Sequence, residues 1–150
     1  MKAITIWQPW ASLIACGAKK FETRSWKTDY RGPIAIHAGA KPYLSVVEGL
    51  PEEFQKALKD IFDLRYEILH IGKILATAEL VDCHNIYKEK NKGAFISKED
   101  GWLWISEKEQ LFGDWQEGRY AWELANVKML PKPVPAKGHQ RLWEWEDKRC

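Results

Sequence analysis

The residues best suited to chemistry lie in one eight-residue stretch that begins at Gly17. Within it, Lys19, Glu22 and Arg24 place an amine, a carboxylate and a guanidinium close together in the sequence. A lysine beside a carboxylate can have its pKa tuned for proton transfer, and an arginine can bind phosphate through two parallel hydrogen bonds. The stretch therefore suits either catalysis or the binding of a phosphate-bearing ligand. On composition alone, a solvated run of surface ion pairs is the alternative.

The local backbone decides which of these side chains meet. In an extended segment, Glu22 and Arg24 would share one face with Lys20, while Lys19 would lie on the other face. In a turn, Lys19 and Glu22 would converge instead. Both arrangements remain open from the sequence.

Aromatic residues lie on both sides of this stretch. The chain has nine tryptophans in 150 residues, and Trp7, Trp10 and Trp26 are the ones nearest the charged residues. A tryptophan ring offers a flat face for a nucleobase, which contributes about 1–3 kcal/mol per base in single-strand binders. Core packing is the alternative for each tryptophan. Trp122 and Trp143 are the strongest core candidates because strand-forming residues flank them.

Three more polar residues have two interpretations each. Gln8 either contacts the edge of a base or bonds the backbone at the start of the helix that follows it. Lys137 either contacts phosphate, helped by the close backbone approach that Gly138 permits, or belongs to a solvated loop. His37 is flanked by apolar residues, which favours a structural histidine over a catalytic one.

The elements that must position these residues are short. Alternating or continuous apolar residues predict strands at 3–7, 34–38, 74–81, 120–124, 127–130 and 142–145. Helices are expected to begin at Pro9, Pro51 and Ser106, with Ser106 as N-cap and Glu109 as its capping-box partner. Residues 88–98 are polar and are expected to form a surface loop. Short strands with a few helices predict a small mixed α+β domain or a partly open barrel.

Length and composition limit the class of protein. With 150 residues, of which 45% are hydrophobic and 29% charged, we expect one globular domain over residues 1–150. No apolar run approaches the ~18 residues of a membrane span, and residues 1–7 do not resemble a signal peptide. We therefore expect a cytoplasmic protein with no membrane partner. The odd set Cys16, Cys83 and Cys150, without a C-x-x-C pair, predicts neither a disulfide framework nor a zinc site.

The net charge of +2 hides an uneven distribution. Residues 1–49 carry seven Lys and Arg against three Asp and Glu, whereas residues 50–118 carry nine against fourteen. Residues 119–150 carry seven against four. Both ends are therefore basic and the middle is acidic. If the two ends meet in space, they form a positive surface on a nearly neutral protein.

The order of these motifs resembles one protein family. Gly17, Lys19, Glu22 and Arg24 match G-x-K-x-x-E-x-R, the signature of the ASCH domain, which is a relative of the PUA domain. Further blocks resemble those of one ASCH branch in the same order, at residues 7–11, 22–26, 32–38, 119–124 and 133–138. The resemblance implies an α+β fold, a PUA-like partly open β-barrel with two or three flanking helices.

The resemblance also implies a function. In this family the motif is thought to line a cleft for RNA or for a piece of it, so we expect an RNA or modified-nucleoside ligand. We expect no cofactor, no resident metal and a monomeric protein. The expected binding residues are Lys19, Glu22, Arg24, Trp7, Gln8, Trp10, Trp26 and Lys137.

Three alternatives stay open. One ASCH branch hydrolyses the amide of N4-acetylcytidine with a Lys, Thr and Glu set. Its lysine falls on Lys19 and its threonine falls on Glu22, so Lys19 would act as base or proton shuttle and Glu22 would orient it. Another relative cleaves single-stranded RNA with a divalent metal and matches this chain only at Lys19. The third alternative is a protein-interaction module whose cleft has lost its ligand.

Overall fold

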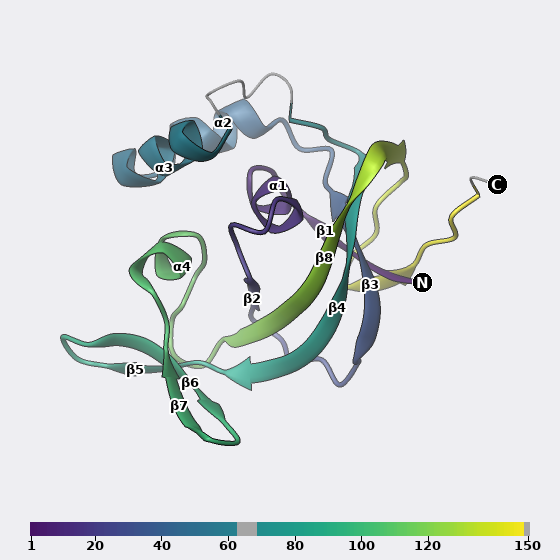
Figure 1. The fold of residues 1–150 in the computed structure, drawn as a ribbon. Coiled ribbons are helices and arrows are strands. Elements are labelled where there is room, and N and C mark those ends of the chain that lie inside the picture. Colours follow the sequence, from purple (N-terminus) through teal and green to yellow (C-terminus); the bar gives the residue numbers. More distant parts are fainter. Residues whose placement is uncertain (63–68, 149–150) are drawn as a thin grey trace. The chain divides into compact units, whose positions relative to one another are not determined.

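The computed structural model describes residues 1–62 and 69–148, so Cys150 lies outside the described residues. Contacts divide the chain into two compact units, which are described separately. The first unit comprises residues 1–18, 33–78 and 126–150, and the second comprises residues 19–32 and 79–125. Two long strands, β4 (Lys73–Asn85) and β8 (Tyr120–Pro135), run through both units (Figure 1). The expectation of a single domain stays a prediction.

A six-stranded mixed sheet has the strand order β2-β8-β4-β3-β1-β9. Its shorter strands are β1 (Lys2–Ile6), β2 (Phe21–Arg24), β3 (Gly32–Ala38) and β9 (Leu142–Glu144). β1 pairs parallel with β3 and antiparallel with β9, and β2 pairs antiparallel with β8. β2 and β9 end this order, so the sheet formed by the described residues is open. Together with the helices, it confirms the expected α+β class.

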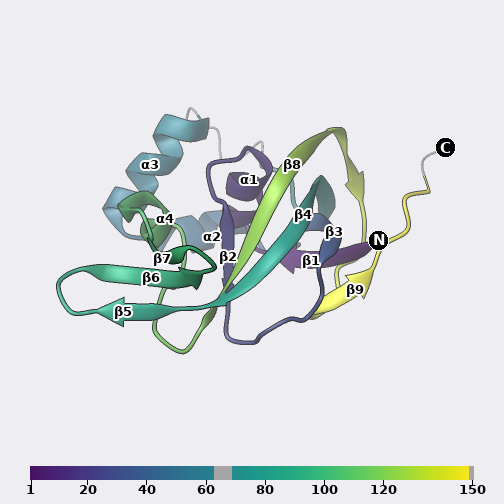
Figure 2. The ribbon, with the colours of Figure 1, turned by 60° about the horizontal axis from the view of Figure 1, so that its bottom comes forward.

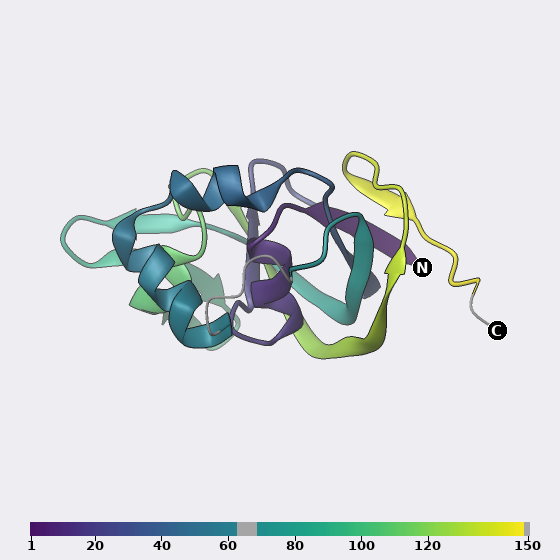
Figure 3. The ribbon, with the colours of Figure 1, turned by 90° about the horizontal axis from the view of Figure 1, so that it is seen from above.

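In the first unit, β1 and β3 form the centre of the core. Their parallel register aligns Ala3 with Ala35 and Ile4 with Ile36, and all four side chains are buried. Strands buried on both faces are typically continuous apolar runs, which explains the sequence of β3. Figure 3 shows β9 beside β1, with the labelled N-terminus at that edge.

Three helices belong to the first unit. They are α1 (Trp10–Ala15), α2 (Tyr43–Glu48) and α3 (Glu52–Phe62). α1 follows Pro9 and ends before Gly17, whose φ of +84° suits a glycine at a helix C-terminus. α3 has acidic residues in its first turn, as expected after Pro51, and buries Phe54 and Leu58. α2 has no counterpart in the sequence prediction.

The second unit contains a separate three-stranded antiparallel sheet of β5 (Tyr87–Glu89), β6 (Gly93–Lys98) and β7 (Gly101–Trp104) (Figure 2). The surface loop expected at residues 88–98 is therefore wrong. Ala94 and Ile96 are buried while Phe95 between them faces the other way, which is the period of two that defines a strand. The sequence prediction missed this strand because the segment has many lysines and its alternating apolar pattern is short.

The second unit also contains α4 (Glu107–Leu111). Its N-cap is Ser106, as predicted, because the Ser106 hydroxyl accepts a hydrogen bond from the Glu109 backbone N–H at 3.1 Å. None of the helices in the described part of the chain has the length and hydrophobicity that a membrane crossing requires.

Candidate functional site

β2 carries the carboxylate and the guanidinium of the motif on one face, as strand alternation predicts. Arg24 donates from Nε and Nη2 to Oε2 of Glu22, at 2.9 Å and 2.8 Å. The Glu22 side chain is 10% exposed and that of Arg24 is 25% exposed. The guanidinium is therefore fixed by two contacts with a buried carboxylate, while part of the arginine side chain is exposed to solvent.

Lys19 lies just before β2 and is buried, with 1% of its surface exposed. Its ammonium donates a hydrogen bond to the backbone carbonyl of Phe112 at 2.8 Å. Burial lowers the pKa of Lys19 below its ordinary value, since desolvation disfavours the charged form, and the carboxylates of Glu22 and Glu109 only partly oppose this. The structure therefore places Lys19 beneath the surface, where it cannot contact a ligand without a local opening.

Glu109 is a buried carboxylate that the sequence prediction assigned a different role. Its two oxygens accept hydrogen bonds from the backbone N–H groups of Lys20 and Phe21, at 3.1 Å and 3.2 Å. The capping-box bond expected from Glu109 to Ser106 is therefore wrong, because the carboxylate serves the backbone before β2 instead. This arrangement ties the segment around Lys19 to α4.

Gly113 completes the surroundings of Lys19. A Cβ atom at this position would lie 3.2 Å from Nζ of Lys19, 3.2 Å from Oγ1 of Thr23 and 2.9 Å from Nε1 of Trp115. The last distance is shorter than real Cβ contacts, so a glycine is needed here for the backbone to pass this close. Thr23 also accepts a hydrogen bond from the Asp114 backbone N–H at 3.0 Å. No motif in the sequence indicated Gly113, and Thr23 was part of the block at residues 22–26 without a role of its own.

Trp26, the candidate tryptophan that belongs to the second unit, packs on a core residue. Its ring meets that of Trp122 in a T-shaped contact with centroids 4.7 Å apart. Trp122 is fully buried, which confirms it as a core residue, whereas Trp143 is only partly buried. Trp115 and Trp145 are buried more deeply than Trp143, and the sequence prediction did not single them out.

Two candidate tryptophans belong to the first unit and differ in exposure. Trp7 is 51% exposed, and the ammonium of Lys41 lies 3.8 Å from the centroid of its ring. This is the geometry of a cation–π contact, and Lys41 was not predicted to take part. Trp10 is partly buried and packs against Phe54 of α3 with centroids 6.0 Å apart. Trp7 is thus the one of the two that offers aromatic surface to the solvent.

Gln8 is fully buried, and its amide bonds other parts of the protein. Its Oε1 accepts from the Ser12 backbone N–H at 2.9 Å, and its Nε2 donates to the Ser12 hydroxyl and to the backbone carbonyl of His70. This is the second of the two interpretations drawn from the sequence, a side chain that bonds the backbone at the helix start.

Lys137 is exposed, and the glycine after it is required for packing. A Cβ on Gly138 would lie 2.6 Å from Oγ1 of Thr5 and 2.7 Å from Cε1 of His37. The close approach that Gly138 permits is therefore to the protein's own core. His37 is 1% exposed and bonds Thr5 and the carbonyl of Ala136, which fits a structural histidine.

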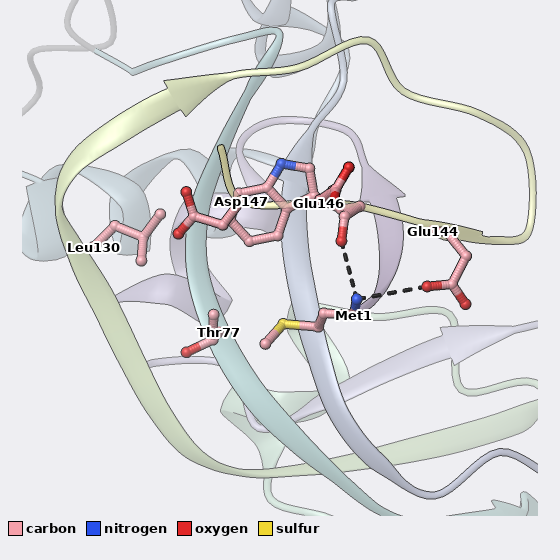
Figure 4. Close-up of a pocket in the computed structure, with 7 residues that line it drawn as sticks. Met1, Thr77, Leu130, Glu144, Glu146 and Asp147 are labelled. Carbon is pink, nitrogen blue, oxygen red and sulfur yellow. Dashed lines mark hydrogen bonds and ion pairs between the residues drawn. The ribbon is translucent and has the colours of Figure 1, made fainter. Parts of the chain in front are cut away.

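The first unit also contains an open pocket of about 600 Å³ next to the N-terminus (Figure 4). The amine of Met1 contacts the Glu144 carboxylate at 3.5 Å and the carbonyl of Trp145 at 3.0 Å. Glu146 and Asp147 also line the pocket, so its charge opposes a phosphate-bearing ligand. Within residues 1–62 and 69–148, no three His, Cys, Asp or Glu side chains are grouped to hold a metal ion.

Comparison with known proteins shows a family match and two similar sequences. The family model of the ASCH domain matches residues 4–134. The human and mouse proteins named Activating signal cointegrator 1 are 28% and 26% identical to this chain over 148 residues, which is 97% of the chain. The chain spans only 22% of the length of these relatives.

Among solved structures, a crystal structure of a mutant ZmASCH protein from Zymomonas mobilis aligns with a TM-score of 0.49 and 14% sequence identity. The alignment covers 98% of this chain and 90% of that one. The match to the family model covers most of the chain, from Ile4 in the middle of β1 to Val134 in the proline-rich end of β8. The protein therefore belongs to the ASCH domain family.

Proposed function

We propose that this protein binds RNA, or a nucleotide-like piece of it, through a surface of the second unit centred on Arg24. The observation that carries the proposal is the pairing of Arg24 with Glu22, which fixes a partly exposed guanidinium by two N–H groups at 2.8–2.9 Å. A guanidinium held in this way loses less side-chain freedom when it binds a phosphate than a mobile one would. Membership of the ASCH family, which is related to RNA-binding PUA-like folds, supports the same ligand.

In this proposal the buried residues position Arg24 and do not touch the ligand. The Glu22 carboxylate interacts electrostatically with both Lys19 and Arg24. Glu109 holds the backbone that leads into β2 through two hydrogen bonds. Trp26, two residues after the end of β2, is only partly buried and is proposed to add the exposed part of its ring to this surface. Trp7 and Lys137, both exposed in the first unit, remain separate proposed contacts. We also propose that the protein acts as a monomer in the cytoplasm.

The test is a titration of fluorescently labelled single-stranded RNA at several salt concentrations. Wild type is expected to bind, with an affinity that falls as salt rises, because phosphate contacts release counterions. Arg24→Ala is expected to weaken binding and to reduce the salt dependence by about one phosphate contact. Lys27→Ala is the matched control, since Lys27 is an exposed cation of the same unit in a long 4.0 Å pair with Asp29.

Two results of this titration would contradict the proposal. Wild type without affinity for RNA at low salt would remove the proposed function. Equal losses for Arg24→Ala and Lys27→Ala would show a general charge effect and would remove the assignment to Arg24.

The amidohydrolase remains a second candidate because of the pKa of Lys19. A buried amine with a lowered pKa, near two carboxylates and the Thr23 hydroxyl, is a typical feature of proton-transfer sites. Incubation with N4-acetylcytidine and related acylated nucleosides, followed by chromatography, tests this activity, and an RNA incubation with Mg²⁺ tests the ribonuclease. Turnover that Lys19→Met abolishes would support the hydrolase; no turnover, or turnover that survives Lys19→Met, would exclude this version.

A further inference from the structure

The strand β7 forms one edge of the three-stranded sheet in the second unit. The strand order β5-β6-β7 gives β7 a neighbour on one side only, among the residues that the structure describes. All four of its residues, Gly101–Trp104, are exposed. Figure 1 shows the β6–β7 hairpin extending away from α4. β7 therefore presents a strand edge to the solvent.

The pairing of β7 with β6 shows which backbone groups face this edge. In an antiparallel pair, residues that bond the neighbouring strand alternate with residues that do not. The Ile105 N–H donates to the carbonyl of Ala94 at 3.0 Å, and the same alternation places Leu103 in a bonded pair with β6. Trp102 and Trp104 are the intervening residues, so their N–H and C=O groups point away from β6. These four groups are in position to pair with one more strand.

The sequence of β7 has none of the side chains that usually protect an edge. Natural edge strands often carry proline, lysine or another charged residue, which discourages pairing, whereas β7 reads Gly-Trp-Leu-Trp. Trp102 is 65% exposed and Trp104 is 46% exposed. Both rings pack on Phe95 of β6, with centroids 5.4 Å and 4.8 Å away. Backbone groups that face outward and fixed side chains beside them are what β-strand addition uses for affinity and specificity.

The charges next to Trp102 are negative. Glu99 and Asp100 form the turn before β7, and both are exposed without an ion pair inside the described ranges. Lys98, which precedes them, pairs instead with the Glu123 carboxylate at 3.1 Å. An exposed tryptophan ring and two carboxylates both attract a cation. The same carboxylates repel a phosphate backbone, which disfavours a nucleic acid at this edge.

We infer that β7 docks an extended segment of a partner protein, which joins the sheet as a fourth strand and places a lysine or arginine side chain over Trp102. A polypeptide supplies N–H and C=O groups at the spacing of the edge, and a basic one supplies the cation that Glu99 and Asp100 lack. A second copy of β7 would bring two more carboxylates and no cation. The inference is independent of the proposed function, since β7 and β2 belong to different sheets.

The first test is a titration of the full chain with labelled peptides, followed by fluorescence anisotropy. The probe is a capped eight-residue peptide of alternating arginine and valine, and its matched control is a glutamate–valine peptide of the same length. Wild type is expected to bind the arginine peptide at least about tenfold more tightly than the glutamate peptide, because like charges at the edge oppose binding. Replacing both turn carboxylates, in Glu99→Lys/Asp100→Lys, is expected to reverse this preference.

Two single variants test the contact with the ring. Trp102→Ala is expected to weaken binding of the arginine peptide by about 2- to 5-fold, the effect of an exposed cation–π contact. Leu103→Ala is the matched control, because Leu103 is an exposed neighbour on the same strand whose side chain lies on the other face. Its affinity for the peptide is expected to equal that of wild type.

Amide hydrogen exchange, measured by NMR, tests the strand pairing itself. In the free protein, the Leu103 N–H is expected to be protected by its bond to β6, while those of Trp102 and Trp104 exchange freely. Saturation with the arginine peptide is expected to slow exchange at Trp102 and Trp104 by about fivefold or more, the effect of one hydrogen bond each.

Several results would overturn the inference. No binding of the arginine peptide, or equal binding of the two peptides, would exclude a basic occupant. Binding without slower exchange at Trp102 and Trp104 would exclude strand addition, and equal losses for Trp102→Ala and Leu103→Ala would indicate damage to the sheet.

Other occupants of the edge would give their own results, each of which contradicts the inference. A dimer in sedimentation that Trp102→Ala dissociates would assign the edge to a second copy of the chain. Binding of single-stranded RNA that Trp102→Ala weakens, with peptide binding unchanged, would assign it to a nucleic acid. Wild type that binds the arginine peptide but not RNA would overturn the proposed function and support this inference.

Discussion

Each unit of the molecule buries a polar cluster, and the two clusters differ in charge. In the first unit, Trp143 donates to Thr5, the Thr5 hydroxyl bonds Nδ1 of His37, and Nε2 of His37 bonds the carbonyl of Ala136. This chain can be satisfied by a neutral imidazole that donates from Nε2 and accepts at Nδ1. In the second unit, the buried groups are the Lys19 amine and the carboxylates of Glu22 and Glu109.

The difference indicates which cluster serves the fold alone. A closed set of neutral hydrogen bonds removes the cost of burying its groups and fixes the loop at Ala136. Burying an ammonium is costly even when carboxylates lie near it, and apolar residues of similar size often replace such groups without loss of stability. Stability alone therefore explains the charged cluster of the second unit less well than it explains the neutral cluster of the first.

The largest expected effect follows from breaking the charged cluster. Lys19→Ala is expected to lower the free energy of unfolding by about 3–5 kcal/mol, because Glu22 and Glu109 lose a buried cation and a cavity forms. Urea unfolding followed by tryptophan fluorescence measures the change. Lys20→Ala, at the exposed neighbour, is the control and is expected to stay within about 0.5 kcal/mol of wild type. Equal stability of the two variants would show that Lys19 is not buried as described.

A smaller effect is expected from crowding the neutral cluster. In Gly138→Ala the new Cβ would lie 2.6 Å from Oγ1 of Thr5, so the loop must shift, at a cost of about 1–3 kcal/mol. Gly49→Ala is the matched control, because its Cβ would make only an ordinary 3.6 Å contact with the carbonyl of Val46. Thermal unfolding of both variants compares them. A Gly138→Ala variant as stable as Gly49→Ala would contradict the close packing against His37.

The smallest effect is a dependence of stability on pH in the first unit. Burial lowers the pKa of His37, so the unfolded chain takes up a proton at a higher pH than the folded chain. Stability is therefore fully present above pH 6.5 and falls as the pH drops from 6.5 toward the folded pKa. The measurement is urea unfolding of wild type and His37→Gln across this range. A stability difference between them that does not change with pH would contradict a neutral, buried His37.

Local signals predicted the local structure. The proline before α1, Gly17 after it and Ser106 before α4 have side-chain and backbone chemistry that acts within one helical turn, and all three have the expected roles. Strand alternation likewise predicted that Glu22 and Arg24 share a face.

Partners distant in sequence could not be predicted. The Glu109 carboxylate bonds backbone groups 88 and 89 residues away, and the ammonium of Lys19 bonds a carbonyl 93 residues away. Two consecutive lysines are usually both exposed to solvent, so nothing in the sequence indicated that Lys19 would be buried. The sheet of β5, β6 and β7 was missed because lysines dominate the composition of residues 88–98.

The central claim is that Glu22 holds Arg24 in place for a phosphate, and a double-mutant cycle on RNA affinity tests it most directly. The cycle compares wild type, Glu22→Ala, Arg24→Ala and the double variant in the labelled single-stranded RNA titration. Positioning predicts that Glu22→Ala weakens binding when Arg24 is present and not when it is absent, with a coupling energy of about 0.5–3 kcal/mol. If Glu22→Ala tightens binding equally in both backgrounds, Glu22 acts only as a repelling charge, and the account is wrong.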